Sequence, residues 1–446
     1  MKRISLILLS LLTFASFAYA GGNTTNVDEI NVRVTDTVSP SVTYADSPSL
    51  DSFGRLRTGQ PYGILDSKQL YNRNLGRTTE VTAGISTTIE YLPNESSSLM
   101  TLGTDDGAYA IRQSVRYPAY VPGKSQLILA TGVLGTGTAN VVRRIGYFDD
   151  DNGLFFQFSG SILSVCVRTF TSGAAVDSCK AQADWNLDKF DGSGKSKIDI
   201  DESKTQIFVI DFQWLGVGRV RFGFDIDGQV IYVHEVLNAN NLTTVYMTSP
   251  TLPVRYEIRN IGVSAGGTLK DICHSVISEG GYALPGLEFA AASGTTSVAV
   301  TTRRPVFAIR LKSSFGGKDN RRTARLLRAD FFHAGNAIVY YELFHIHSPS
   351  SITATWTEAH ADSAVEYSTD ISAITGDHEH RISYAYASSA TGASGAPSSS
   401  PTEFINEHSY INQSYASDNS QVFVIYATSV SGTPAVHSGI IWIEFD

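Results

Sequence analysis

The sequence predicts an all-β protein made of two sandwiches, and three observations support this class. Short runs rich in aromatic and β-branched residues recur from about position 78, at the roughly 8 to 15 residue spacing of short strands and turns. Turn-forming residues separate the runs, and glycine is plentiful at 38 residues. No segment keeps a helical period of apolar residues. We therefore expect a jelly-roll sandwich over residues 76–285 and a second β-sandwich over residues 286–446.

The first twenty residues, MKRISLILLSLLTFASFAYA, have the organisation of a secretory signal peptide. Lys2 and Arg3 precede an apolar run that ends with small residues at Ala18 and Ala20. No later stretch approaches the roughly 18 uncharged apolar residues that a membrane span needs. The sequence therefore predicts a signal peptide at 1–20, an exported, extracellular protein, and no integral membrane span after cleavage. An uncleaved N-terminal anchor is the alternative.

Composition limits the partners of the chain. Residues 21–75 are rich in Thr, Ser, Pro, Asn and Asp, and we expect them to form an extended arm that attaches the protein to a larger assembly. The formal net charge is −9, whereas a nucleic-acid binder needs a basic face to neutralise phosphates. Nucleic acid is therefore not expected as a partner.

A hairpin is expected over residues 217–235, VGRVRFGFDIDGQVIYVHE. Asp227 and Gly228 fit a two-residue type I′ turn, which requires positive φ at both central positions. Alternation on the first arm places Phe222 and Phe224 on one apolar face and the arginines on the polar face.

The three cysteines are too few for a disulfide scaffold. Cys166 and Cys179 lie at equal distances from the turn region 171–174, so a hairpin there would place them opposite one another. Export permits a disulfide between them and leaves Cys273 as the odd thiol. Two buried free cysteines are the alternative.

Two kinds of metal site are considered. His345 and His347, and likewise His378 and His380, lie two apart, so each pair would share one face of a strand. Two imidazoles make an incomplete metal site unless a symmetry-related copy adds ligands, so half-exposed strand histidines are the alternative. No cofactor is expected otherwise. Aspartates at 149–151, followed by Asn152, and further aspartates between 188 and 201 suggest a structural Ca²⁺ site, and ordinary turn aspartates are the alternative.

Ligand binding is expected at aromatic and basic residues. Trp185 and Trp214 can stack on sugar rings if exposed, and core packing is the alternative for both. The basic run 303–328, which includes Arg321 and Arg322, can recognise anionic glycans or lipid headgroups. A solvated face, or pairing with acidic surface on a neighbouring subunit, is its other interpretation.

None of the sequence motifs indicates an enzymatic activity. The segment from Lys197 through Asp199 to Glu202 resembles the Glu-x-Asp-x-x-Glu strand of laminarinase-like glycoside hydrolases, whose fold is a concanavalin-type sandwich. The resemblance implies a nucleophilic Glu at the position that Lys197 occupies, and a retaining mechanism needs two carboxyls about 5 Å apart. We therefore expect no enzyme and no catalytic residues.

Three longer motifs resemble a family of large tailed-phage virion proteins common in marine and environmental viruses. They are DSFGRLRTGQPYGILDSK (51–68), YVPGKSQ (120–126) and FQWLGVGRVRFGF (212–224). The resemblance extends from about Ser47 to the C-terminus and implies a concanavalin or laminin-G-like sandwich. The signal peptide departs from that family, whose members assemble in the cytoplasm.

This resemblance predicts a virion-type structural protein, such as a surface fibre, decoration or tail-associated component, that attaches to a surface. It implies a homo-oligomer, with a trimer favoured, or other virion proteins as partners, and a place on the virion surface. Surface glycans are a further expected partner. The alternative is a secreted, lectin-like carbohydrate-binding protein.

Overall fold

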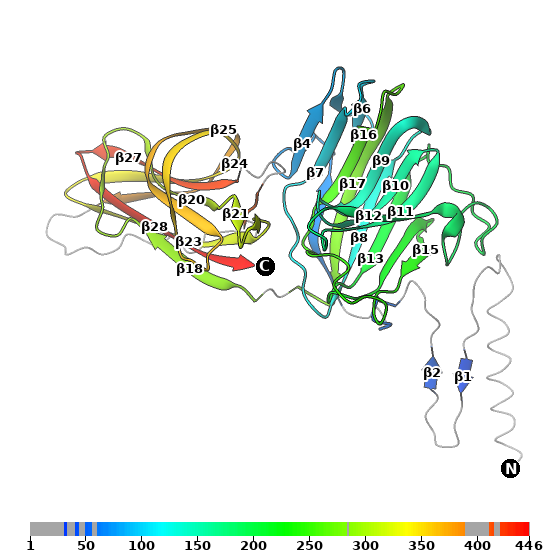
Figure 1. The fold of residues 1–446 in the computed structure, drawn as a ribbon. Coiled ribbons are helices and arrows are strands. Elements are labelled where there is room, and N and C mark those ends of the chain that lie inside the picture. The colour runs from blue at the N-terminus through cyan, green and yellow to red at the C-terminus, as the bar shows by residue number, and fades with distance from the viewer. Residues whose placement is uncertain are drawn as a thin grey trace, which may run out of the picture.

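The computed structural model describes residues 31–33, 41–43, 50–55, 60–282, 285–388, 410–413 and 420–445. Within these ranges one short 3-10 helix, η1 (Gln182–Asp184), accompanies two β domains (Figure 1). The predicted all-β class, a jelly-roll sandwich followed by a second β domain, is confirmed. The predicted signal peptide lies outside the described residues. No helix among the described residues is long and apolar enough to cross a membrane.

The first domain is a sandwich of two antiparallel sheets. Consecutive strands such as 8 and 9, or 16 and 17, lie in different sheets, which is the crossing pattern of a jelly roll. The seven-stranded sheet has the order β12 (Val176–Ala181), β11 (Ile162–Thr169), β10 (Gly153–Gly160), β9 (Thr138–Phe148), β16 (Val254–Asn260), β7 (Tyr109–Ser114), β4 (Thr78–Ala83). The eight-stranded sheet has the order β15 (Gln229–Val236), β14 (Val220–Ile226), β13 (Gln206–Phe212), β8 (Ser125–Val133), β17 (Gly267–Glu279), β6 (Ser97–Leu102), β5 (Thr88–Leu92), with β3 (Pro61–Lys68) paired to β17.

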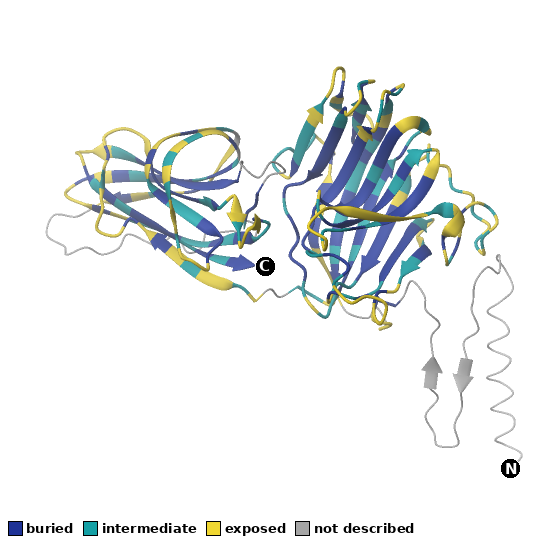
Figure 2. Ribbon diagram, viewed as in Figure 1, coloured by how far each residue is buried: buried dark blue, intermediate teal, exposed yellow. Residues whose placement is uncertain are grey.

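The core of this sandwich is built from the apolar rows that alternation turns inward. Phe156 of the seven-stranded sheet lies among Phe208, Phe222 and Phe224 of the opposite sheet, with ring centroids 5.1, 5.6 and 5.0 Å away. All four side chains are buried. Buried residues form dark blue bands across the strands of this domain (Figure 2). Burial of each ring contributes about 1.5–3 kcal/mol to the stability of the fold.

The sandwich begins earlier in the chain than the sequence predicts. Strand β3 pairs with β17 along its length. Upstream, the Ser52 hydroxyl donates to Asp211 Oδ1 at 3.1 Å, and Arg221 Nη2 donates to the Leu50 carbonyl at 2.5 Å. The predicted arm over 21–75 is therefore wrong for its last part, because composition does not report pairing with residues so distant in the chain. Before it, β1 (Asn31–Arg33) and β2 (Ser41–Thr43) pair with each other.

The predicted hairpin is formed by β14 and β15, and Asp227 and Gly228 have φ of +53° and +82°. Alternation predicts that the polar face of this hairpin is exposed, but in the structure this face is also buried. Arg221 and Asp211 form an ion pair there, and the Tyr232 hydroxyl donates to the same carboxylate at 3.0 Å.

The second domain packs a five-stranded sheet against four strands that close on one another. A shared core includes Phe307, Tyr341 and Trp442, all fully buried. The sheet has the order β18 (Leu287–Ala292), β28 (Ala435–Phe445), β23 (Thr323–Ala334), β26 (Tyr410–Ile411), with β19 (Val298–Ala299) paired to β28. The closed set is β20 (Arg304–Leu311), β25 (Val365–Ser388), β24 (Ile338–Glu358) and β27 (Val422–Ser431), and a small pair is formed by β21 (Ser314–Phe315) and β22 (Lys318–Asp319).

Candidate functional site

A cleft of about 510 Å³ lies where loops of the first domain face the second domain. We call it the Trp214 cleft. Its lining combines aromatic rings and prolines with polar side chains. The residues are Tyr120, Val121, Pro122, Trp214, Thr248, Ser249, Pro250, Thr251 and Pro285, opposite Phe315, Lys318, Asp319, Asn320, Arg321 and Arg322.

Trp214 follows the end of β13 and is held firmly at the cleft. Its backbone N–H donates to the Tyr120 hydroxyl at 3.0 Å, and its indole Nε1 donates to the Met247 carbonyl at 3.0 Å. The Tyr120 ring meets the indole edge-on, with centroids 6.3 Å apart. The side chain stays partly exposed, so a fixed aromatic surface faces the cleft.

Arg321 and Arg322 enter the same cleft from the second domain. The Arg321 guanidinium lies 5.0 Å from the ring centroid of Tyr117, and that of Arg322 lies 4.6 Å from the ring centroid of Phe315. The structure thus brings together three predicted ligand-binding residues, Trp214, Arg321 and Arg322, that lie far apart in the chain.

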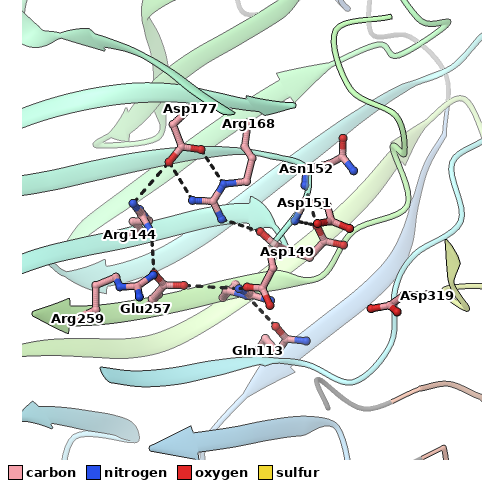
Figure 3. Close-up of polar contacts among 12 residues, drawn as sticks. Gln113, Arg144, Asp149, Asp151, Asn152, Arg168, Asp177, Glu257, Arg259 and Asp319 are labelled. Atoms are coloured by element: carbon pink, nitrogen blue, oxygen red, sulfur yellow. Dashed lines mark hydrogen bonds and ion pairs between the residues drawn. The ribbon is translucent and has the colours of Figure 1, made fainter. Parts of the chain in front are cut away.

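A second polar surface covers the outer face of the seven-stranded sheet (Figure 3). Arg168 Nε and Nη2 donate to the two carboxylate oxygens of Asp177 at 2.7 and 2.9 Å. Arg144 Nη1 donates to Glu257 at 2.8 Å, and Arg255 binds the same carboxylate at 3.5 Å. We call these five residues the arginine face. Sequence reasoning missed it, because the ion pair between Arg144 and Glu257 joins strands that are distant in the chain.

Aromatic rings lie directly beneath the arginines. The guanidinium of Arg144 is 5.4 Å from the ring centroid of Phe155, and that of Arg168 is 5.2 Å from the same ring. Arg255 lies 5.2 Å from the ring centroid of Phe148. Such contacts contribute about 0.5–2 kcal/mol each when desolvated, so they help to hold the arginines in place.

Burial and ion pairing shift the pKa values of two carboxyls here. Burial alone would raise the pKa of Asp177, but its hydrogen bond to Arg168 and the charges of Arg168 and Arg144 lower it overall. Burial raises the pKa of Asp149 despite the N–H donors of its turn. Asp177 is therefore ionised at neutral pH and balances the nearby arginines.

The loop at 149–152 joins the arginine face to the Trp214 cleft. Arg168 Nη1 donates to the Asp149 carbonyl oxygen at 2.9 Å, and the Asn152 N–H donates to the Asp149 carboxylate at 2.8 Å. The Thr248 N–H then donates to Asn152 Oδ1 at 2.8 Å, and Thr248 lines the cleft. The Asp149 carboxylate is occupied by backbone donors of its own turn, as the alternative to calcium binding predicts.

Cys166 and Cys179 form the disulfide that the predicted hairpin permits. Cys166 and Cys179 are register partners on β11 and β12 and form a disulfide. Cys166 packs in a small cluster with Phe148 and Phe155 under the arginine face. Cys273 is free and partly buried.

Trp185 is placed in the core, contrary to its predicted role in ligand binding. Its side chain is only 4% exposed, and its ring centroid lies 6.4 Å from that of Phe224. Its Nε1 donates to the Lys180 carbonyl at 3.1 Å. A tryptophan whose polar end is satisfied inside the sandwich is a packing residue, and it has no surface for a sugar.

The predicted histidine pairs do not build a metal site among the described side chains. His345 and His347 share one face of β24, as expected, with ring centroids 4.0 Å apart. The side chain of Gln421 bridges them, 3.2 Å from His345 Nε2 and 3.1 Å from His347 Nδ1. His380 approaches His347, with centroids 5.1 Å apart, and the side chain of His378 lies outside the described residues.

The bridge fixes the tautomer of His345. Gln421 Oε1 accepts from His345 Nε2, so this nitrogen carries the hydrogen of the neutral ring. Across the described part of the chain, no group of three or more His, Cys, Asp or Glu side chains is arranged to hold a metal ion.

The aspartates between 188 and 201 also cap turns. Asp188 accepts the N–H groups of Phe190 and Ser196 at 3.0 and 2.7 Å. Asp191 and Asp201 each accept the backbone N–H of the residue two positions later, at 2.9 Å. These local bonds account for the carboxylates that suggested a structural Ca²⁺.

The segment that resembles a hydrolase strand lies in a loop between η1 and β13. Lys197 has φ of +60°, and Asp199 forms an isolated bridge with Asp191. Neither Lys197 nor Asp199 is buried. The segment therefore does not line a sheet face as the catalytic strand of that family does.

No protein-family model and no curated protein matches the chain. Solved structures with a similar fold include a glycoside hydrolase family protein from Mycobacterium thermorestibile, at 11% identity over 48% of this chain and 99% of that chain, with a TM-score of 0.34. A β-1,3-glucanase from Mycobacterium marinum matches at 13% identity, 49% and 99% coverage and a TM-score of 0.33. A legume lectin-like domain from Entamoeba histolytica matches at 10% identity, 48% and 97% coverage and a TM-score of 0.28.

At these identities the likeness concerns the fold alone. Glycoside hydrolases recur among these structures, and this finding contradicts the prediction that the chain is no enzyme. We therefore abandon that prediction.

Proposed function

We propose that the chain is a carbohydrate-binding protein and that the Trp214 cleft is its binding site. The observation that carries this proposal is the meeting of Trp214, Arg321 and Arg322 around one cleft between the domains. Sugar-binding sites combine an aromatic ring, which packs against the apolar face of a pyranose, with a few polar groups that fix its orientation.

The lining of the cleft supplies both components. Trp214 gives an aromatic surface that hydrogen bonds to Tyr120 and Met247 hold in place, so little side-chain entropy is lost when a ligand binds. Asp319 and Arg321 lie 3.4 Å apart in an ion pair and offer both an acceptor and donors to sugar hydroxyls.

A glycan array followed by calorimetry tests this proposal. We expect binding by the wild-type chain and an affinity loss of about tenfold or more in Trp214→Ala, as removal of an aromatic anchor produces in other interfaces. Trp356→Ala is the matched control, because Trp356 is also half-buried but stacks on Arg310 in the second domain, 4.1 Å away. An array without hits, or equal losses in both variants, would contradict the proposal.

We propose separately, from the three sequence motifs alone, that the chain is a virion-type attachment component that is exported and assembles as a homo-oligomer, with a trimer favoured. Strand β3 places the second half of the first motif in the folded domain. Light scattering at micromolar concentration and gene neighbourhood are the tests. A discrete monomer, or neighbouring genes with no capsid or tail function, would contradict it.

A further inference from the structure

A second cavity, of about 440 Å³, lies between the domains and is separate from the Trp214 cleft. It contains the His345–Gln421–His347 network described above. Tyrosines and arginines from both domains complete its wall. The first domain contributes Tyr62, Ile64, Asp66, Arg77, Arg116 and Tyr282, and the second contributes Arg325, His345, His347, Tyr410, Gln421 and Phe445, among others.

The charges of this cavity are unbalanced. Arg77 lies 3.6 Å from Asp66, and both are exposed. Arg116 and Arg325 form no ion pair with any described carboxylate. Within the described residues, two guanidinium groups without a carboxylate partner therefore line one cavity of a protein whose formal net charge is −9.

Arg116 is held in place but keeps unused hydrogen-bonding capacity. Its Nη1 donates to the Ile64 carbonyl at 2.9 Å, and its guanidinium lies 4.1 Å from the ring centroid of Tyr410. Its Nε is buried and has no hydrogen-bond partner within the described residues. An unmade hydrogen bond of a charged group is costly, so the guanidinium of Arg116 is not fully satisfied by the described residues.

Aromatic rings beside the arginines favour a ring-shaped ligand. Tyr62 and Tyr282 stack with centroids 5.5 Å apart and an interplanar angle of 12°. Tyr62 remains 45% exposed, so this apolar surface is accessible. Apolar ring faces beside guanidinium groups match a sugar that bears a carboxylate better than a small inorganic anion.

We propose that this cavity is a second binding site and that it takes an acidic saccharide, with the uronic acid carboxylate between Arg116 and Arg325. His345 and His347, fixed by Gln421, provide the polar floor for sugar hydroxyls. The site does not depend on the Trp214 cleft.

Isothermal titration of the full chain with a galacturonic acid trisaccharide tests the proposal. A neutral galactose trisaccharide and inorganic phosphate are the comparison ligands. We expect the acidic trisaccharide to bind and Arg325→Gln to reduce its affinity about tenfold or more, as loss of a charge-assisted hydrogen bond does. Among the described residues the Arg325 side chain makes a ring contact with Phe445 at 5.6 Å and no ion pair, so we expect this substitution to spare the fold.

Arg328→Gln on the same strand is the matched control, because Arg328 pairs with Asp330 and does not line this cavity. This control should keep the affinity for the acidic trisaccharide. No binding of that ligand, equal binding of the neutral one, or unchanged affinity in Arg325→Gln would overturn the proposal. Phosphate that binds as tightly as the acidic trisaccharide would overturn the assignment to a sugar.

Discussion

His274 of β17 shows how one buried side chain makes stability depend on pH. Both of its ring nitrogens are buried and lack a hydrogen-bond partner within the described part of the chain. Burial is the main cause that lowers the pKa of His274 from 6.5 to about 4. The unfolded chain therefore takes up a proton first as the pH falls, and the native state loses stability between about pH 6.5 and pH 4.

Replacement of this ring by an apolar side chain should flatten the acid limb of the stability curve. We expect His274→Leu to reduce the loss of unfolding free energy between pH 7 and pH 4 by up to about 3 kcal/mol. Urea unfolding at pH 7, 5 and 4 measures this difference. Parallel curves for wild type and His274→Leu would contradict the prediction.

At the scale of the strand pair, the β14–β15 turn depends on a glycine. Gly228 has φ of +82°, and a Cβ atom added there would meet no other atom within 4 Å, so backbone conformation alone disfavours a substitution. We expect Gly228→Ala to destabilise the protein by about 1 kcal/mol. Gly63→Ala is the control, since Gly63 also has open space but no positive φ. Thermal unfolding of the two variants should separate them, and equal midpoints would contradict this account.

The β11–β12 pair is joined by its disulfide, which closes a short loop with a sequence separation of 13. A cross-link over such a loop stabilises by about 3 kcal/mol. We expect Cys179→Ser to lower the free energy of unfolding by about 2–4 kcal/mol and to remove its sensitivity to reductant. Guanidinium unfolding with and without dithiothreitol measures both effects. Cys273→Ser should remain sensitive to reductant, and a wild-type chain insensitive to it would contradict the prediction.

Local patterns were sufficient for the strands, the Asp227-Gly228 turn and the opposition of Cys166 and Cys179, because each depends on neighbouring residues. They were not sufficient for the arginine face. Its partners, such as Arg144 and Glu257, lie 113 positions apart in the sequence. Trp185 and Trp214 also look alike locally, and only the packing of the sandwich separates a core ring from a cleft ring.

At the scale of the molecule, the segment from Leu50 to Arg55 closes the outer face of the eight-stranded sheet. It provides the Leu50 carbonyl to Arg221, the Asp51 carbonyl to Arg219 and the Ser52 hydroxyl to Asp211. Asp211 is fully buried as a result. The segment therefore provides hydrogen-bond partners to charged side chains on the outer face of the sheet, which would lack these partners if the segment were absent.

Removal of residues 1–55 should destabilise the first domain, whereas removal of residues 1–49 should not. Hydrogen bonds to charged groups contribute about 1.5–3 kcal/mol each, and the cost of ordering a short segment offsets part of this sum. We expect a net loss of about 2 kcal/mol or more for the longer deletion, measured by urea unfolding. Equal stability of the two truncated chains would contradict the prediction.

The disulfide also has a consequence for association between molecules. Strand β12 is the last strand of its sheet, and it carries Asp177, Lys180 and Cys179 on an exposed edge. If reduction freed this strand, β11 would present a row of unpaired backbone groups and apolar side chains to other copies of the chain. Charged edge strands discourage such pairing between sheets. By tethering β12, the cross-link keeps the backbone edge of β11 covered.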